Sequence, residues 1–155
     1  MKAQREALVQ WLRDQLPGWN ISDRQRVVRH GASRLYQASV MGDPIRYVEV
    51  AYDPVFESDY QSEWRRREVR HYQFVLYIYL QYEDAETLDA SSQAEWEELL
   101  EGTPGLLRQL ASVVQVSYAG TTYLIFPVSV ETQLVALDEA GRQVVHFAEL
   151  RVRVR

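Results

Sequence analysis

The side chains that most often perform acid–base or metal chemistry are sparse in this chain. Its three histidines, His30, His71 and His146, lie far apart in sequence, and no two of them have the i, i+4 spacing of a helical metal site. His71 and His146 fall in strand-like runs and could meet across a sheet. A half-buried strand histidine is more often a packing or hydrogen-bonding residue than a ligand. We therefore expect no metal site.

Motifs for nucleophilic or phosphate chemistry are missing from the sequence. It contains no G-x-S-x-G elbow, no glycine-rich phosphate loop and no H-E-x-x-H pattern. It has no cysteine, which excludes disulfides, thiol catalysis and cysteine-ligated metals. The acidic residues at 83–89 lack the alternating spacing and the glycine of a calcium loop, so they indicate a solvated connection. We expect neither catalysis nor a cofactor.

The segment WRRRE (64–68) is one of two basic candidates for a binding site. It places Trp64 beside Arg65, Arg66 and Arg67. These residues could be the solvated start of a strand. They could equally anchor the chain to an acidic partner surface, because Trp and Arg are enriched among interface hot spots.

The second basic candidate lies at residues 151–155. Arg151, Arg153 and Arg155 alternate along a strand-like run, so they share one face at a spacing of about 6–7 Å. Such a row is either a charged edge that deters aggregation or a docking stripe of complementary charge. Arginine is favoured throughout, since Lys2 is the only lysine among 17 basic residues. Either a GC-rich coding bias or selection for arginine forks at interfaces would explain the preference for arginine over lysine.

Composition narrows the class of protein. With 155 residues, 46% of them hydrophobic and 25% charged, the chain suits one globular domain with its own core. The net charge of −5 argues against sequence-specific nucleic-acid binding, which usually requires a basic balance. No apolar run reaches 18 residues, and residues 1–16 are mixed with charge. We expect neither a membrane span nor a signal peptide.

The first half of the chain begins with an amphipathic helix. Residues 2–16 carry an apolar stripe at i, i+3, i+4 spacing, made of Ala7, Leu8, Trp11, Leu12 and Leu16. Pro17 and Gly18 should end this helix. Two strands are predicted at 34–41 and 45–52 around a turn at 42–44, followed by a polar and mobile loop at about 53–68.

A long strand follows, in the run REVRHYQFVLYIYLQYED (67–84). One face is apolar and predicts a core contact, with Tyr72, Phe74, Leu76, Ile78, Leu80 and Tyr82. The other face is aromatic and polar at once, with His71, Gln73, Val75, Tyr77, Tyr79 and Gln81.

The second half begins with two helices and ends in strands. Ser92 and Glu95 form a capping-box pattern that predicts a helix start, and Gly102 should end that helix. A short helix should follow with Pro104 at its first position. Three strands complete the chain, with turns at Ala119-Gly120 and at 138–141. Pro127 lacks an N–H and predicts a sheet edge or a bulge.

This order predicts a single α+β domain over 1–155. Its mostly antiparallel sheet should be covered on one face by the N-terminal helix and the central helical pair. The other face, with Tyr77, Tyr79, Phe147 and Arg151, then has no element of this chain to cover it. An exposed aromatic patch of this kind usually marks an interaction site.

The pattern resembles the tail terminator (tail completion) proteins of long-tailed bacteriophages. The resemblance lies in the N-terminal helix, the strand DPIRYVEVAY, the acidic loop DPVFESDYQSEW, the long strand REVRHYQFVLYIYLQY and the closing HFAELRVRV. The chain departs from that outline at 20–41, where an extra strand or two is expected, and at Thr103-Pro104-Gly105, which splits the helix.

The resemblance implies a structural protein of the virion that assembles in the host cytoplasm. Its copies would form a ring, typically a hexamer, that caps the tail tube protein and later binds a head-completion or neck protein. A second copy would then cover the aromatic face. The alternative is a small-ligand binding or enzymatic α+β domain, a cone-like fold with His71, His146, Tyr77 and Tyr79 around an aromatic pocket. An adaptor elsewhere in the phage neck, or an unrelated scaffold, would show the same features as a terminator.

Overall fold

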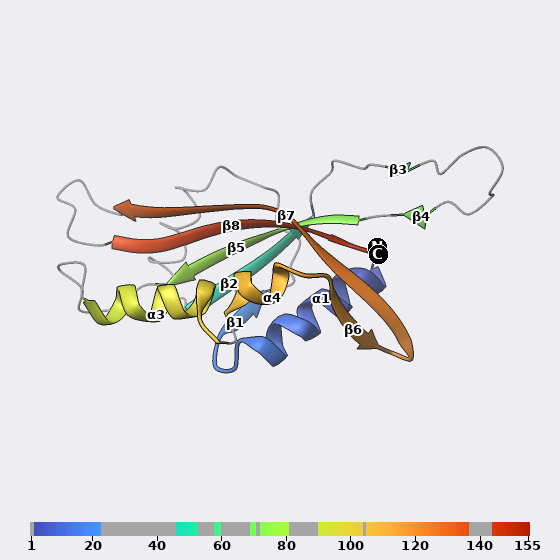
Figure 1. Ribbon diagram of the computed structural model, residues 1–155, viewed down its shortest axis with the longest axis horizontal. Coiled ribbons are helices and arrows are strands. Elements are labelled where there is room, and N and C mark those ends of the chain that lie inside the picture. The colour runs from blue at the N-terminus through green and yellow to red at the C-terminus, as the bar shows by residue number, and fades with distance from the viewer. Residues whose placement is uncertain are drawn as a thin grey trace.

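A curled six-stranded sheet with helices on one side forms the framework of the protein (Figure 1). The computed structural model describes residues 2–22, 46–52, 58–59, 69–70, 72–80, 90–103, 105–136 and 144–155. The elements in chain order are α1 (Lys2–Gln15), β1 (Asn20–Ser22), β2 (Arg46–Tyr52), β3 (Ser58–Asp59), β4 (Val69–Arg70), β5 (Tyr72–Leu80), α3 (Ala90–Glu101), α4 (Leu106–Leu110), β6 (Val114–Tyr118), β7 (Thr121–Ala136) and β8 (Val144–Val154). The predicted α+β class is confirmed.

The strand order is β1-β2-β5-β8-β7-β6. Only the β1–β2 pair is parallel in this sheet. The order places β8, the last strand along the chain, between β5 and β7. The strand predicted at 34–41 lies outside the described residues. Within the sheet, β2 lies between β1 and β5. Strand β1 falls at the start of the stretch 20–41, where an extra strand or two was expected without stated bounds.

Helix α1 forms for the reason its sequence suggests. Its apolar stripe is buried, and the helix ends at Gln15. The N–H of Trp19 donates to the carbonyl of Leu16 at 3.1 Å, and Gly18 adopts φ +83°, a conformation that glycine tolerates without strain. The predicted stop at Pro17-Gly18 is therefore confirmed.

The main core lies between the helices and one face of the sheet. Phe74, Leu76, Ile78 and Leu80 of β5 are fully buried in it, together with the alternate residues of β8 that begin at Ala148. Figure 1 shows α1, α3 and α4 on the same side of the sheet. The predicted apolar face of the long strand, and its cover by these helices, are both confirmed.

The two central helices begin at other residues than predicted. Helix α3 starts at Ala90, so Ser92 lies inside it and the capping box is wrong. Glu95 instead holds Arg46 of β2. Helix α4 starts after Gly105, so Pro104 does not occupy its first position. A Cβ on Gly105 would lie 2.4 Å from the backbone nitrogen of Gly102, so the two helices meet where only glycine fits.

Strands β6 and β7 form the predicted hairpin. Ala119 and Gly120 have φ of 49° and 79°, and Tyr118 pairs with Thr121, which defines a two-residue turn of the kind that favours right-handed strand twist. The register of β7 against β8 shifts between Pro127 and Ser129, so Pro127 adjoins a β-bulge as predicted.

The predicted loop at 53–68 is not wholly irregular. Ser58 and Asp59 form β3 and pair with Arg70 and Val69 of β4, which makes a second sheet of two strands. The rest of that loop lies outside the described residues, as does the turn at 138–141.

Candidate interaction surfaces

The structure brings six of the predicted site residues onto one side of the sheet, opposite the helices. They are Tyr77, Tyr79, Phe147, Arg151, Arg153 and Arg155. The other five, Trp64, Arg65, Arg66, Arg67 and His71, lie outside the described residues. We call this side the second face.

An aromatic cluster occupies the centre of the second face. Tyr79 stands opposite both Tyr47 of β2 and Phe147 of β8, with ring centroids 5.8 and 5.3 Å apart. The ring of Tyr77 stacks on Phe147 at 6.0 Å. Such offset or tilted pairs add stabilisation beyond the area they bury. The pairing register of the strands, rather than proximity in sequence, creates this cluster.

The expectation that this aromatic face is exposed is wrong. Tyr77, Tyr79 and Phe147 are only 8%, 5% and 5% exposed in a single chain. The rings pack against one another across three adjacent strands, and Tyr47, Tyr77 and Tyr79 make further interactions. A second copy of the protein is therefore not needed to bury them.

A carboxylate is buried beside this cluster. Glu49 of β2 is 3% exposed and stands directly opposite Tyr77, whose other cross-strand neighbour is Glu149 of β8. Glu149 in turn forms an ion pair with Arg151, with 2.7 Å between its Oε1 and a terminal guanidinium nitrogen. Burial of an ionisable group in an aromatic setting is unusual, because desolvation disfavours the charged form. Sequence reasoning did not identify Glu49 as a candidate residue.

The C-terminal arginines form a row along the second face, as predicted. Arg151 and Arg155 are exposed, and Arg153 is half-buried. The backbone of Arg155 exchanges two hydrogen bonds with Leu124 of β7, at 3.0 and 2.9 Å. The row is therefore held on a regular ladder up to its last residue and is not frayed.

The outer edge of β7 is a surface that sequence reasoning did not identify. Strand β7 has 16 residues, but β6 pairs only with Thr121–Ile125. From Val128 to Ala136 no strand of the described sheet pairs with this edge. Val128 and Val130 are 42% and 40% exposed there. The only sequence signal was Pro127, which correctly predicted an irregularity just beyond the residues of β7 that pair with β6.

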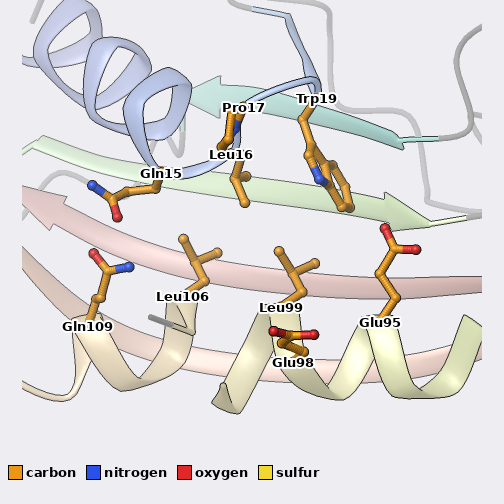
Figure 2. Close-up of a pocket in the computed structure, with 9 residues that line it drawn as sticks. All are labelled: Gln15, Leu16, Pro17, Trp19, Glu95, Glu98, Leu99, Leu106 and Gln109. Atoms are coloured by element: carbon orange, nitrogen blue, oxygen red, sulfur yellow. The ribbon is translucent and has the colours of Figure 1, made fainter. Parts of the chain in front are cut away.

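A pocket of about 200 Å³ lies between the end of α1 and the helices α3 and α4 (Figure 2). Leu16, Pro17, Leu99 and Leu106 give it an apolar lining. Gln15 faces Gln109 at one end, and Trp19 faces Glu95 at the other, while Glu98 adds a second carboxylate. Three separate segments of the chain contribute these residues, so no local pattern could have predicted the pocket.

The carboxylate of Glu95 already binds a guanidinium. Arg46 donates to it from Nε at 2.7 Å and from a terminal nitrogen at 3.0 Å, which is the two-point geometry that carboxylates and guanidinium groups share. This hydrogen bond raises the pKa of Arg46. The pair joins β2 to α3 and fixes one wall of the pocket.

His146 lies on the helix-covered face, away from Tyr77 and Tyr79. Its ring stacks on Trp96 of α3 at 5.3 Å, and burial lowers its pKa from the ordinary value of 6.5. Residues 146 and 147 point to opposite faces of β8, as successive strand residues do. The aromatic pocket envisaged for the small-ligand alternative therefore cannot include both His146 and the tyrosines.

Other kinds of site find little support in the part of the chain that the structure describes. Those residues include no group of three His, Asp or Glu side chains placed to hold a metal ion. None of the described helices is long and apolar enough to cross a membrane. Comparison of the sequence with protein-family models and with curated proteins finds no match.

Proposed function

We propose that this chain is a structural assembly protein of the tail terminator type. Copies of it would form a ring, typically of six, that caps the tail tube and later joins a head-completion or neck protein. The protein would act in the virion after assembly in the host cytoplasm. It has no catalytic role in this proposal.

The observation that carries the proposal is the outer edge of β7. An edge strand presents a row of backbone N–H and C=O groups that can pair with another chain, and natural proteins usually protect such edges. Here the edge runs from Val128 to Ala136, and its only described charged residue is Glu131. Full burial of a valine side chain contributes roughly 1.5–3 kcal/mol, so covering the exposed part of Val128 and Val130 would contribute about 1 kcal/mol each.

The order of elements supports the same proposal. The elements follow the order that the resemblance to tail terminators implies: an N-terminal helix, a strand, a long central strand, helices and a closing β-hairpin. A likeness of fold alone does not establish function, so the assembly surface must be tested directly.

The test is the mass of the purified chain in solution, measured by light scattering from low to high micromolar concentration. We expect a closed oligomer of defined size, and we expect Val128→Glu with Val130→Glu to shift it to monomer. Val113→Glu is the matched control, because Val113 is an exposed valine outside this edge. A chain that stays monomeric at every concentration would contradict the proposal.

One observation favours the small-ligand alternative, namely the burial of Glu49 among tyrosines. Ionisable groups in such surroundings cluster at functional sites. Thermal denaturation in the presence of a small-molecule library separates the two functions. A monomer that a ligand stabilises, and that loses this response in Glu49→Gln, would support the alternative instead.

A further inference from the structure

We propose that the pocket between α1 and the α3–α4 pair receives the side chain of Arg155 from a second copy of this chain. The inference rests on the assembly role proposed above and names a specific contact within it. It makes the subunit interface two-sided, with an acidic pocket on one copy and the end of β8 on the next.

The pocket has the chemistry that an arginine side chain requires. Its apolar lining by Leu16, Leu99 and Leu106 suits the aliphatic stem. Trp19 offers an aromatic face, over which a guanidinium is attracted by the ring's quadrupole. Glu98 supplies a carboxylate, and Gln15 supplies an amide oxygen as an acceptor. A volume of about 200 Å³ is suited to one side chain rather than to a larger ligand.

Helix α3 is strongly acidic, and only part of its charge is paired with a basic residue in the described part of the chain. The helix carries four glutamates and no basic residue, and Glu98 and Glu101 lie in its last turn, where the helix dipole disfavours negative charge. Glu95 is paired with Arg46, and Glu97 accepts a hydrogen bond from Gln93 at 3.0 Å. The side chain of Glu98 has no hydrogen bond or ion pair among the described residues. A cation from outside the chain would therefore stabilise this end of α3.

Arg155 is the best placed of the C-terminal arginines to supply that cation. Arg151 is held by Glu149 at 2.7 Å, and Arg153 is half-buried and already engaged. Arg155 is exposed and has no interaction of its side chain in the described structure. Its backbone is fixed on Leu124 by two hydrogen bonds, so the side chain projects from a rigid strand. A preorganised group loses less freedom on binding.

The contact must be made between copies. Helix α3 lies over the other end of β8, where Trp96 stacks on His146. Arg155 lies nine positions beyond His146, about 30 Å along a strand, and it is on the second face, opposite the helices. Arg155 therefore cannot reach the pocket of its own chain. A contact between two different surfaces is heterologous, and it generates a ring when the rotation between copies closes.

The experiment is a charge exchange in the full chain, followed by sedimentation or light scattering over a concentration series. Glu98→Arg and Arg155→Glu should each raise the dissociation constant of the subunit contact by roughly tenfold or more, because each places like charges together and about 1.4 kcal/mol corresponds to tenfold. The double variant should restore assembly. Glu97→Arg and Arg13→Glu are matched controls, since both residues are exposed and lie outside the pocket.

The outcomes separate this contact from the assembly role. Rescue by the double variant supports the inference. The inference is overturned if the wild-type chain forms an oligomer that neither single variant weakens. It is also overturned if the double variant folds natively by circular dichroism but does not restore assembly. In both cases the assembly role stands. A wild-type chain that is monomeric at all concentrations overturns both.

Discussion

Gly105→Ala tests whether the close approach of α3 and α4 is a fixed feature of the fold. Gly105 has φ −77° and ψ 149°, a conformation that alanine adopts freely. Any loss of stability must therefore come from contact. The added Cβ would lie 2.4 Å from the backbone nitrogen of Gly102 and 2.7 Å from the carbonyl carbon of Glu101. Backbone atoms cannot move aside as the end of a flexible side chain can.

The cost follows from what must move. To bring the nearest atom from 2.4 Å to ordinary contact at 3.4 Å, α4 must withdraw from α3. That movement breaks the 2.8 Å hydrogen bond from the N–H of Gly105 to the carbonyl of Gly102, which contributes about 1 kcal/mol. It also lifts Leu106 and Leu110 part of the way out of the core, at about 1 kcal/mol each. We expect a loss of about 3 kcal/mol.

Urea denaturation followed by circular dichroism would measure this loss. Gly18→Ala is the control. A Cβ on Gly18 would meet no atom within 4 Å, but the residue adopts φ +83°. This variant should therefore lose only the cost of the left-handed conformation, about 1 kcal/mol. If Gly105→Ala stays within 1 kcal/mol of the wild type, or costs less than Gly18→Ala, the packing of α4 against α3 is not as described.

Three further predictions concern the core and its polar contacts. Burial lowers the pKa of His146 in the folded protein below the 6.5 of an unfolded chain. At pH values between the folded pKa and 6.5, the unfolded state therefore binds more protons than the folded state. The free energy of unfolding should therefore fall as the pH drops below about 6.5, and His146→Phe, which keeps a ring on Trp96, should show a smaller fall in urea titrations at neutral and acidic pH. A double-mutant cycle of Arg46→Ala and Glu95→Ala should give a coupling energy of about 0.5–1 kcal/mol, as both side chains are partly exposed, and a value near zero would mean that the pair contributes nothing. Phe74→Ala should lower the free energy of unfolding by about 3–5 kcal/mol, and an unchanged denaturation midpoint would refute its place at the centre of the core.

Hydrophobic periodicity predicted the elements in which apolar and polar residues separate clearly onto different faces. The stripe of α1 and the alternation of β5 were strong enough to give both the element and the side that packs in the main core. Strand β1 falls in the stretch where an extra strand or two was expected, but its bounds were not predicted, because it has three residues and its parallel partner is separated from it by the chain between Ser22 and Arg46. The capping box failed because Glu95 forms a tertiary ion pair with a residue 49 positions earlier.

The candidate surfaces were less predictable, for a physical reason. Alternation shows which residues share a face, and it correctly grouped Tyr77, Tyr79 and Phe147. It does not show whether that face is covered, since the covering depends on segments brought together only in three dimensions. The pocket and the open edge of β7 were not predicted for the same reason. Each depends on where a neighbouring element stops, which sequence patterns locate poorly.

The central position of β8 affects how the protein folds during synthesis. Its neighbours β5 and β7 have both been translated before it, yet they pair with β8 and not with each other. The six-stranded sheet therefore cannot close until residues 144–154 have left the ribosome, and until then the edges of β5 and β7 that pair with β8 have no partner strand. Nascent chains in this state are prone to aggregate. Folding yield should therefore depend on protection of the incomplete sheet by chaperones more than on the rate at which α1 forms.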